Sequence, residues 1–295
     1  MSIEMNIQWF PGHMTKARRM MEEQLRLVDA VCEVVDARIP ESSRNPDLQE
    51  LVGDTKPLVL VLNRVDQADP EITKLWAAYY RDRGYVVLET DSQSGRGVDA
   101  LRPALKKRLA EKLEQNRKKG LVGKPLRAMV AGIPNVGKSA FINRVANRRA
   151  VVAADRPGVT RGKQWITVGD GLELLDTPGI LWPRFDNQRV GENLAFTGAV
   201  KDAILDQETL AANLFLRLRE SYPERILARY KFTPDPEADG YALLETAGRK
   251  RGFLISGGEV DTLRMAVILL DEFRGSKLGR ISLERPPVEG AEDRD

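Results

Sequence analysis

Residues 132–139 read Gly-Ile-Pro-Asn-Val-Gly-Lys-Ser and match the pattern G-x-x-x-x-G-K-[ST] at every fixed position. An apolar run precedes this segment and a helical pattern follows it, which is the strand–loop–helix context that the pattern requires. In such a loop the glycines let backbone N–H groups surround phosphate oxygens, Lys138 adds a positive charge at the β- and γ-phosphates, and Ser139 is a ligand for Mg²⁺. The segment therefore predicts a nucleoside-triphosphate site.

Two segments further along the chain fit the same chemistry. Thr160, in Pro-Gly-Val-Thr, is a candidate switch residue that closes over the γ-phosphate and completes the magnesium shell. Asp176-Thr-Pro-Gly179 follows an apolar run, so that Asp176 can hold the metal's water shell and the Gly179 N–H can meet the γ-phosphate. An ordinary Pro-Gly turn is the alternative for residues 176–179, and it is the better one wherever no phosphate loop lies upstream.

A base-recognition element is expected at Asn63-Arg-Val-Asp66, directly after the apolar run 57–62. The Asp66 carboxylate can accept hydrogen bonds from the ring and amino N–H groups of guanine, and adenine offers no matching donor pair. The segment is similar to the Asn-Lys-x-Asp signature of GTPases, with Arg64 in place of lysine. Asp91 and Ser92 follow the next apolar run, where GTPases use a loop backbone to contact the base.

These segments together define the predicted site. The residues expected to contact the nucleotide are Asn63, Arg64, Val65, Asp66, Asp91, Ser92, Asn135, Val136, Gly137, Lys138, Ser139, Ala140 and Gly179. The residues expected to hold Mg²⁺ are Ser139, Thr160 and Asp176.

The group that would orient the attacking water is not evident from these segments. Ras-like GTPases place a glutamine directly after Asp-x-x-Gly, but here the residue is Ile180, which cannot orient water, so slow intrinsic turnover is expected. His13 is the only histidine, in Gln-Trp-Phe-Pro-Gly-His-Met at residues 8–14, and is either a catalytic candidate or a structural or exposed residue. The side-chain carbonyl of Asn135 is a candidate ligand for a monovalent cation near the phosphates.

The elements that position these residues follow from the alternation of short apolar runs with helical patterns. This rhythm predicts an α/β fold with a mostly parallel sheet and helices on both faces. The predicted strands are residues 30–35, 58–62, 85–88, 128–131, 165–168 and 173–175, and the predicted helices between them include 15–28, 73–83 and 98–119. After Pro183 the pattern is helical, most clearly at 210–218 and 263–273.

The domain organisation is predicted from the same pattern. We expect residues 1–185 to form the nucleotide domain, residues 186–288 a small helical C-terminal domain, and residues 289–295 an acidic tail. The base signature comes before the phosphate loop, whereas Ras-like GTPases have the opposite order, so the first domain is predicted to be a circularly permuted P-loop GTPase domain. Permutation moves the switch segments beside the C-terminal domain, to which their movement could be passed.

Composition sets the limits on partners and location. Across 295 residues, 46 Lys and Arg against 43 Asp and Glu give a net charge of +3, too small to indicate nucleic-acid binding by itself. Locally, however, residues 102–127 hold ten basic side chains against two acidic ones, and residues 144–163 hold six against one. These clusters are either solvated helix faces with a basic linker or a surface that follows RNA phosphates.

Rare residue types exclude several classes of site. A single cysteine, Cys32, lies in an apolar run and is expected to be a small buried side chain, so disulfides within the chain and cysteine zinc sites are excluded. Mechanisms that need two histidines are excluded as well. No apolar stretch approaches the roughly 18 residues of a membrane span. We expect a cytoplasmic monomer without membrane or DNA partners.

With these residues assembled, the chain closely resembles the circularly permuted ribosome biogenesis GTPase A family, YlqF/RbgA, over residues 8–284. The motifs that carry the resemblance are residues 8–14, 35–40, 43–46, 132–139, 176–183, 222–225 and 256–258. The resemblance implies a GTPase in late assembly of the large ribosomal subunit. It would bind the subunit precursor and its rRNA in the GTP state and be released after hydrolysis that the particle, and often K⁺, stimulates.

The resemblance also implies roles for individual residues. His13 matches the histidine that substitutes for the missing glutamine, and Asn135 matches a potassium ligand. The family's helical C-terminal domain binds RNA, which favours the RNA interpretation of the basic residues, including Arg249, Lys250 and Arg251.

Two departures, Arg64 for lysine and Ala140 where threonine is frequent, remove no phosphate or metal ligand but could alter guanine affinity. Two alternatives stay open: a nucleotide-dependent RNA-binding switch with incidental hydrolysis, and an ATP-using enzyme, against which Asp66 argues.

Overall fold

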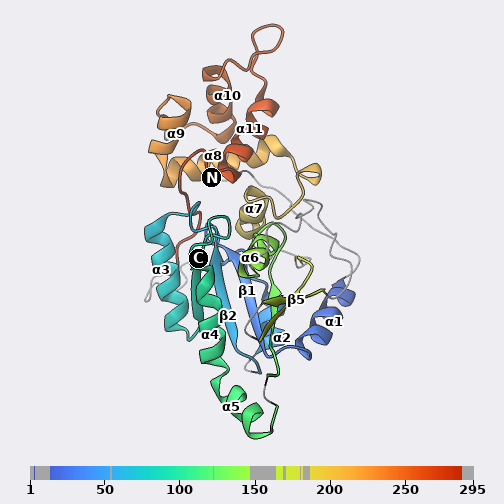
Figure 1. Cartoon of the computed structure of the whole chain (residues 1–295). Helices are drawn as coiled ribbons and strands as arrows, with labels where there is room; N and C mark the ends of the chain where they lie inside the picture. The colour runs from blue at the N-terminus through green and yellow to red at the C-terminus, as the bar shows by residue number, and fades with distance from the viewer. Residues whose placement is uncertain are drawn as a thin grey trace. The chain divides into compact units, whose positions relative to one another are not determined.

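The computed structural model describes residues 3, 14–53, 55–121, 123–146, 164–168, 171–179, 181 and 187–287. The chain forms two compact units (Figure 1). The sheet unit holds the described residues from 14 to 181 together with 284–287, and the helical unit holds Ile3 together with 187–283. Each end of the described chain therefore groups with the unit that is more distant in sequence.

The sheet unit is built on a six-stranded sheet with the order β3-β2-β1-β4-β6-β5. Its strands are β1 (Ala30–Asp36), β2 (Leu58–Asn63), β3 (Val86–Thr90), β4 (Leu126–Ala131), β5 (Gln164–Val168) and β6 (Leu172–Asp176). All neighbouring pairs are parallel except β5 and β6. The predicted mostly parallel α/β sheet is thus confirmed, and each predicted strand is present.

Helices flank this sheet. They are α1 (Met14–Leu25), α2 (Pro46–Val52), α3 (Pro70–Asp82), η1 (Val98–Ala100), α4 (Leu101–Arg108), α5 (Ala110–Lys118) and α6 (Lys138–Val145). Met21 and Leu25 of α1 pack with Leu48 and Val52 of α2 against Val31 and its neighbours on one face. Because successive strand residues point to opposite faces, the other residues of β1 and β4 are left for a second helical layer, which includes α6 (Figure 1).

Two helix predictions were incomplete. The single helix expected over residues 98–119 is instead η1, α4 and α5, with a break at Leu109, whose side chain is buried whereas α5 buries none of its residues. Helix α2 was not anticipated, although Asn45 caps it by accepting from the Leu48 N–H at 3.3 Å and Pro46 occupies its first turn. At seven residues, α2 is too short to show a periodic pattern.

Strand β1 lies at the centre of the fold and is buried along its whole length. Cys32 is fully buried in it, as expected, and burial raises the pKa of its thiol to about 12. Glu33 is buried in the same strand, where Arg44 donates to it through Nε and Nη2, each at 3.2 Å, and the Asn45 N–H donates at 2.9 Å. The Arg44 guanidinium also lies 4.6 Å from the centre of the Tyr85 ring. The Arg44–Glu33 ion pair therefore holds residues 44 and 45, which follow β1 in the chain, against the sheet.

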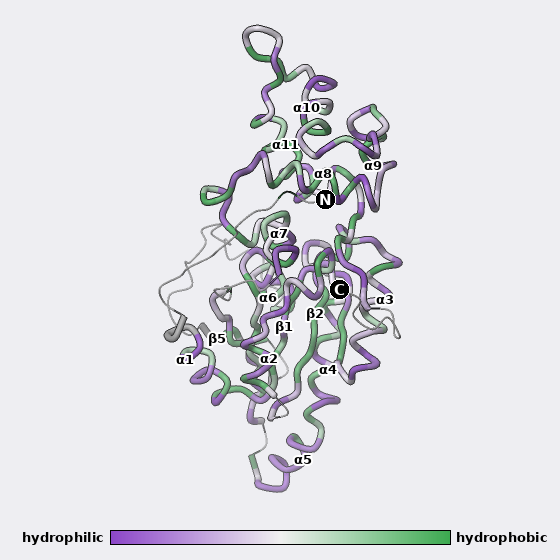
Figure 2. Tube along the Cα trace, turned by 180° about the vertical axis from the view of Figure 1, so that it is seen from behind, coloured by the Kyte–Doolittle hydropathy of each residue, from purple (hydrophilic) through white to green (hydrophobic). Residues whose placement is uncertain are grey.

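The helical unit contains α7 (Gln188–Phe196), η2 (Asp202–Ile204), α8 (Gln207–Ser221), α9 (Pro223–Tyr230), α10 (Gly240–Lys250) and α11 (Thr262–Arg274). Helix α8 is its centre and contacts α7, α9, α10 and α11. Apolar side chains such as Leu210, Leu214 and Phe215 are completely buried, and apolar stretches along α8 and α11 are visible in Figure 2. Apart from one isolated bridge, between Leu254 and Val260, the described part of this unit has no β-structure.

Buried charges also hold the helical unit together. Glu272 of α11 is 5% exposed and accepts hydrogen bonds from Arg229, from the Tyr230 hydroxyl and, at 2.8 Å, from Arg251. Arg249 pairs with Glu245 one turn earlier on α10. Two members of the basic trio 249–251 are therefore engaged within the unit.

Two features are absent from the residues that the structure describes. None of the helices there is long and apolar enough to cross a bilayer. Nor do three or more His, Cys, Asp or Glu side chains gather there into a group that could hold a metal ion.

The buried Arg44–Glu33 pair leads to a stability prediction. Arg44→Met should lower the free energy of unfolding of the sheet unit by about 3 kcal/mol at pH 8, because it leaves a buried carboxylate without its cation. Burial already raises the pKa of Glu33 above its ordinary value, and loss of Arg44 raises it further. When the pKa of Glu33 is higher in the folded state than its unfolded value of about 4.3, the free energy of unfolding falls as pH rises above that value. The destabilisation by Arg44→Met should therefore be smaller at pH 5, where more of the Glu33 carboxyl is protonated.

Urea unfolding at the two pH values measures this difference. Arg81→Met is the control, since it removes an exposed pair with Glu89 and should cost less than about 1 kcal/mol. An equal loss at pH 5 and pH 8 would contradict the assignment.

Candidate nucleotide-binding site

The predicted site residues gather at one edge of the sheet. Strands β1, β2, β3, β4 and β6 are parallel, so the segments that follow them all leave from their carboxyl ends. This edge is where parallel α/β sheets bind ligands. It brings together residues 63–66, 91–96, 132–139 and 176–179, although more than 100 residues separate the first from the last in sequence.

The phosphate loop fits against its neighbours only with glycine at two positions. A Cβ on Gly132 would lie 2.4 Å from the Val34 carbonyl oxygen of β1. Gly137 has φ +92°, and a Cβ there would lie 2.5 Å from the Asn63 side-chain nitrogen. Helix α6 begins immediately afterwards, at Lys138, so its first N–H groups point towards the loop.

Lys138 and Asp176 form the charged centre of the predicted phosphate subsite. Each side chain is 9% exposed. Burial lowers the pKa of Lys138 to about 8 and raises that of Asp176, and the attraction between the two opposes both shifts. A Cβ on Gly179 would lie 2.9 Å from Lys138 Nζ, so the segment 176–179 packs directly on the phosphate loop. The two phosphate-binding elements predicted from sequence are therefore adjacent.

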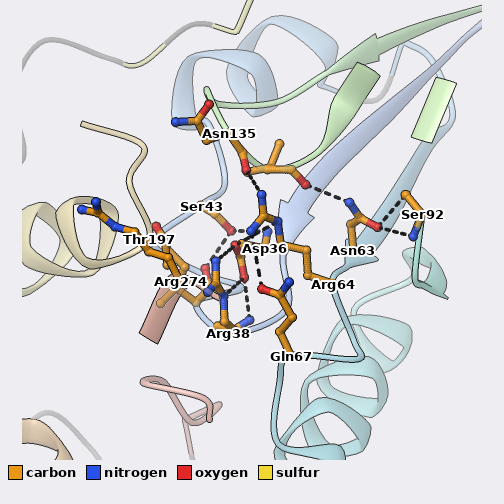
Figure 3. A network of polar contacts seen from close by, with 12 residues as sticks. Asp36, Arg38, Ser43, Asn63, Arg64, Gln67, Ser92, Asn135, Thr197 and Arg274 are labelled. Carbon is orange, nitrogen blue, oxygen red and sulfur yellow. Dashed lines mark hydrogen bonds and ion pairs between the residues drawn. The ribbon is translucent and has the colours of Figure 1, made fainter. Parts of the chain in front are cut away.

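Asn63 connects the phosphate loop with the loop after β3. Its Nδ2 donates to the Val136 carbonyl at 2.8 Å. Its Oδ1 accepts from the Ser92 hydroxyl at 2.7 Å and from the Ser92 N–H at 3.3 Å (Figure 3). It also accepts from the Thr90 hydroxyl at 3.1 Å. The buried Asn63 amide makes all of these hydrogen bonds, so it connects the end of β2 with the phosphate loop and with the loop after β3.

Arg64 also reaches the phosphate loop. Its Nη2 donates to the Asn135 carbonyl at 2.6 Å and its Nε lies 3.8 Å from the Asp36 carboxylate (Figure 3). Both Arg64 and Asn135 adopt positive φ, +65° and +62°. Burial lowers the pKa of Arg64, and Asp36 opposes the shift. The departure from lysine thus still permits a contact with the phosphate loop, through a guanidinium that also faces a carboxylate.

The rest of the base signature lies next to this contact. Val65 is buried, and its N–H donates to the Thr90 carbonyl at 3.2 Å. Asp66 follows it and is exposed, as a group that accepts from a ligand must be.

The pair Asp36–Arg38 was not predicted as part of the site. Arg38 donates to both carboxylate oxygens of Asp36, at 2.9 and 2.7 Å, and both side chains are almost completely buried. Burial works to raise the pKa of Asp36, but the Arg38 contacts and the charge of Arg64 outweigh it and hold that pKa below its usual value. Residues 35–40 form one of the motifs found in the sequence, but the motif does not indicate that this segment lies beside Arg64.

The Asp91 carboxylate shapes its own loop. It accepts the N–H groups of Gln93 at 2.9 Å and Ser94 at 3.3 Å, and the Ser94 hydroxyl. Burial works to raise the pKa of Asp91, and these hydrogen bonds together lower it. Its backbone N–H donates to the Arg96 carbonyl at 2.9 Å, which closes the loop.

Sequence reasoning missed Arg144, which it grouped with the basic cluster 144–163. From the last turn of α6, Arg144 donates through Nε to the Ser92 carbonyl at 3.3 Å and through Nη2 to the Gln93 carbonyl. No motif signals this contact, because it joins segments about 50 residues apart in sequence.

The described residues supply part of the predicted metal site. The Ser139 hydroxyl and the Asp176 carboxylate are hard oxygen ligands of the type that Mg²⁺ prefers, and both lie at the phosphate loop. Ala140 is exposed in the first turn of α6 and offers no ligand. Thr160, Ile180 and His13 lie outside the described residues, so their roles remain predictions, as does cation binding by Asn135.

Comparisons with known proteins agree with this geometry. A family described as 50S ribosome-binding GTPase matches residues 127–220. The chain is 48% identical over 284 residues to a ribosome biogenesis GTPase A of Priestia megaterium, which covers 96% of this chain and 98% of that protein. It is 32% identical over 283 residues to a protein of the same name from Thermotoga maritima, covering 95% of each.

Solved structures give the same result. A GDP-bound YlqF structure aligns with TM-score 0.65 and 28% identity, covering 91% of this chain and 99% of that one. A crystal structure of GNP-bound YlqF from T. maritima aligns with TM-score 0.63 and 27% identity, covering 92% of this chain and 98% of that one.

Asn63 provides a test of this site. Asn63→Ala should weaken GDP binding by about tenfold or more, because it removes the bridge to Val136 and leaves the buried N–H and hydroxyl of Ser92 without their acceptor. Isothermal titration calorimetry measures the effect. Asn116→Ala on α5 is the matched control and should bind as the parent chain does. Unchanged GDP affinity in Asn63→Ala would show that this bridge does not support nucleotide binding.

Proposed function

Since the chain belongs to the ribosome biogenesis GTPase A family and is therefore a GTP hydrolase of ribosome biogenesis, we propose that it serves the assembly of the large ribosomal subunit. It binds the subunit precursor and its rRNA in the GTP state and leaves after hydrolysis. The observation that carries the nucleotide assignment is the Asn63 bridge between the phosphate loop and the loop after β3, because it joins the phosphate and base subsites into one site.

The roles of the residues follow from their chemistry. Asp66 selects guanine, and Lys138 together with the N–H groups of residues 136–140 holds the phosphates. Magnesium, which GTPases of this kind generally use, would be held by Ser139, Thr160 and Asp176 and would neutralise charge on the phosphates. The Gly179 N–H contacts the γ-phosphate. His13 orients the attacking water in place of glutamine, and Asn135 contributes to a K⁺ site.

Basic side chains of both units support an RNA partner. Lys106, Lys107 and Arg108 in the last turn of α4 and Arg117 and Lys118 in the last turn of α5 are exposed. Among the residues that the structure describes, no carboxylate lies within 4 Å of their charged groups. In the helical unit Lys250 is exposed beside the engaged Arg249 and Arg251. We propose that these residues contact rRNA phosphates, and that the protein works as a cytoplasmic monomer without DNA or membrane partners.

A second candidate function uses the same site differently. The protein would be a nucleotide-dependent RNA-binding switch whose hydrolysis is incidental. The position of Ile180, where a water-orienting glutamine is absent, favours this candidate over an efficient stand-alone enzyme. The two differ in whether the particle accelerates hydrolysis.

His13→Ala should remove most of the hydrolysis that large-subunit particles stimulate and leave GTP affinity unchanged, because the imidazole acts on water and not on the nucleotide. Single-turnover rates with and without particles measure this. Lys138→Ala is the comparison, since it should lose nucleotide binding as well. Undiminished stimulation in His13→Ala would exclude the catalytic role, and no stimulation in the unaltered chain would favour the switch.

Sedimentation with large subunits tests the proposed cycle. More protein should sediment with a non-hydrolysable GTP analogue than with GDP, because release is assigned to the state after hydrolysis. The bound fraction should also fall as salt rises, as contacts to RNA phosphates require. Equal sedimentation with both nucleotides would contradict the cycle.

A further inference from the structure

The base and phosphate subsites of this fold are separated by intervening strands. The phosphate loop follows β4 and the loop 91–96 follows β3, and the order β3-β2-β1-β4 places two strands between them. At about 4.8 Å per strand, the starting points of the two loops are roughly 14 Å apart. The distance between the phosphate loop and the loop 91–96 therefore depends on side chains that connect the two loops.

Asn63 supplies one such connection, from the end of the intermediate strand β2. It reaches the loop 91–96 through Ser92, on the side of the loop that faces the sheet. The remainder of the loop is closed on itself, by Asp91 N–H to the Arg96 carbonyl at 2.9 Å and by Gly95 N–H to the Asp91 carbonyl at 2.8 Å.

Arg144 supplies a second connection that is independent of the sheet. It belongs to α6, the helix that begins with Lys138 of the phosphate loop, and it donates to the carbonyls of Ser92 and Gln93. Its side chain lies against Gly95, where an added Cβ would be 3.1 Å from Arg144 Cδ and 3.2 Å from Nε. Gly95 has φ +92°, a backbone conformation that residues with a Cβ rarely adopt, and the absence of a Cβ leaves room for the Arg144 side chain.

The contact is specific in its chemistry. A guanidinium offers several donors in a fixed plane and can serve two successive carbonyls at once, whereas an ammonium has a single centre. A cation in the last turn of a helix is stabilised by the helix dipole, but this effect does not require the side chain to contact another loop. The direction of the Arg144 side chain is instead explained by its hydrogen bonds to the Ser92 and Gln93 carbonyls.

We propose that Arg144 is a positioning residue for guanine: it fixes the loop 91–96 to the helix of the phosphate loop and thereby sets the preference for GDP over ADP. The proposal rests on the guanine-binding function proposed above. Arg144 acts through the loop backbone, because its guanidinium donates to the carbonyls of Ser92 and Gln93.

The test measures GDP and ADP affinity of Arg144→Ala, Arg144→Lys and Arg83→Ala by calorimetry, with thermal unfolding of each. Arg83, at the C-terminal end of α3, is the matched control. It also donates to a backbone carbonyl, that of Tyr79 at 3.2 Å, but this carbonyl belongs to α3 itself. Arg144→Ala should weaken GDP binding about tenfold and leave ADP binding unchanged, so the preference for GDP falls by the same factor. Arg144→Lys should recover part of it, and Arg83→Ala should keep the parent preference.

Each other outcome has a defined meaning. If Arg144→Ala weakens GDP and ADP equally and unfolds at a lower temperature, the residue is only structural and the proposal is overturned. If GDP affinity does not change, the proposal is also overturned while the guanine-binding function stands. If the unaltered chain binds GDP and ADP equally well, the proposed function itself fails, and this is seen before any variant is examined.

Discussion

The site is organised around a buried amide, that of Asn63. A parallel sheet delivers loops to one edge but does not by itself fix the distance between loops that leave from different strands. Asn63 does so because its amide offers both donors and an acceptor, directed to the phosphate loop on one side and to Thr90 and Ser92 on the other. The close approach of Gly137, where no Cβ fits, is a consequence of this contact.

Around this amide the edge of the sheet is densely charged and largely buried. Asp36 is neutralised by Arg38 and approached by Arg64, and Lys138 lies with Asp176. The physical consequences differ between the two groups. In the first group, the Arg38 contacts and the charge of Arg64 hold the pKa of Asp36 below its usual value, so the carboxylate stays ionised. In the second group, burial shifts the pKa values of Lys138 and Asp176 towards the neutral forms. Phosphate and Mg²⁺ are the charges that would restore the ionised forms.

The course of the chain links the two units repeatedly. Ile3 belongs to the helical unit, where its backbone N–H and carbonyl pair with the Asn213 amide, each at 2.8 Å. Glu284 belongs to the sheet unit, where its carboxylate accepts the Glu41 N–H at 2.8 Å and its carbonyl accepts from Trp76 at 3.1 Å. The chain thus passes between the units near both ends as well as between residues 181 and 187.

The strands, the fold class and the nucleotide chemistry could all be predicted from the sequence. These follow from local signals: continuous apolar runs for parallel strands, and fixed spacing for the loop at residues 132–139. The order of the motifs even indicated the permutation. Local pattern failed at Leu109, a buried residue at which one expected helix is divided into α4 and α5, and at α2, which is too short to show a periodic pattern.

The side chains that hold these motifs in place are evident only from the three-dimensional packing. Arg144 reads in sequence as one charge of a basic cluster, and Arg251 as another, yet one binds the loop 91–96 and the other a buried glutamate. Arg64 reads as a departure from lysine and proves to contact both Asp36 and the phosphate loop. The physical reason is the same in each case. A long cationic side chain finds its partner through space, among carbonyls and carboxylates that lie tens of residues away, and local spacing carries no record of that choice.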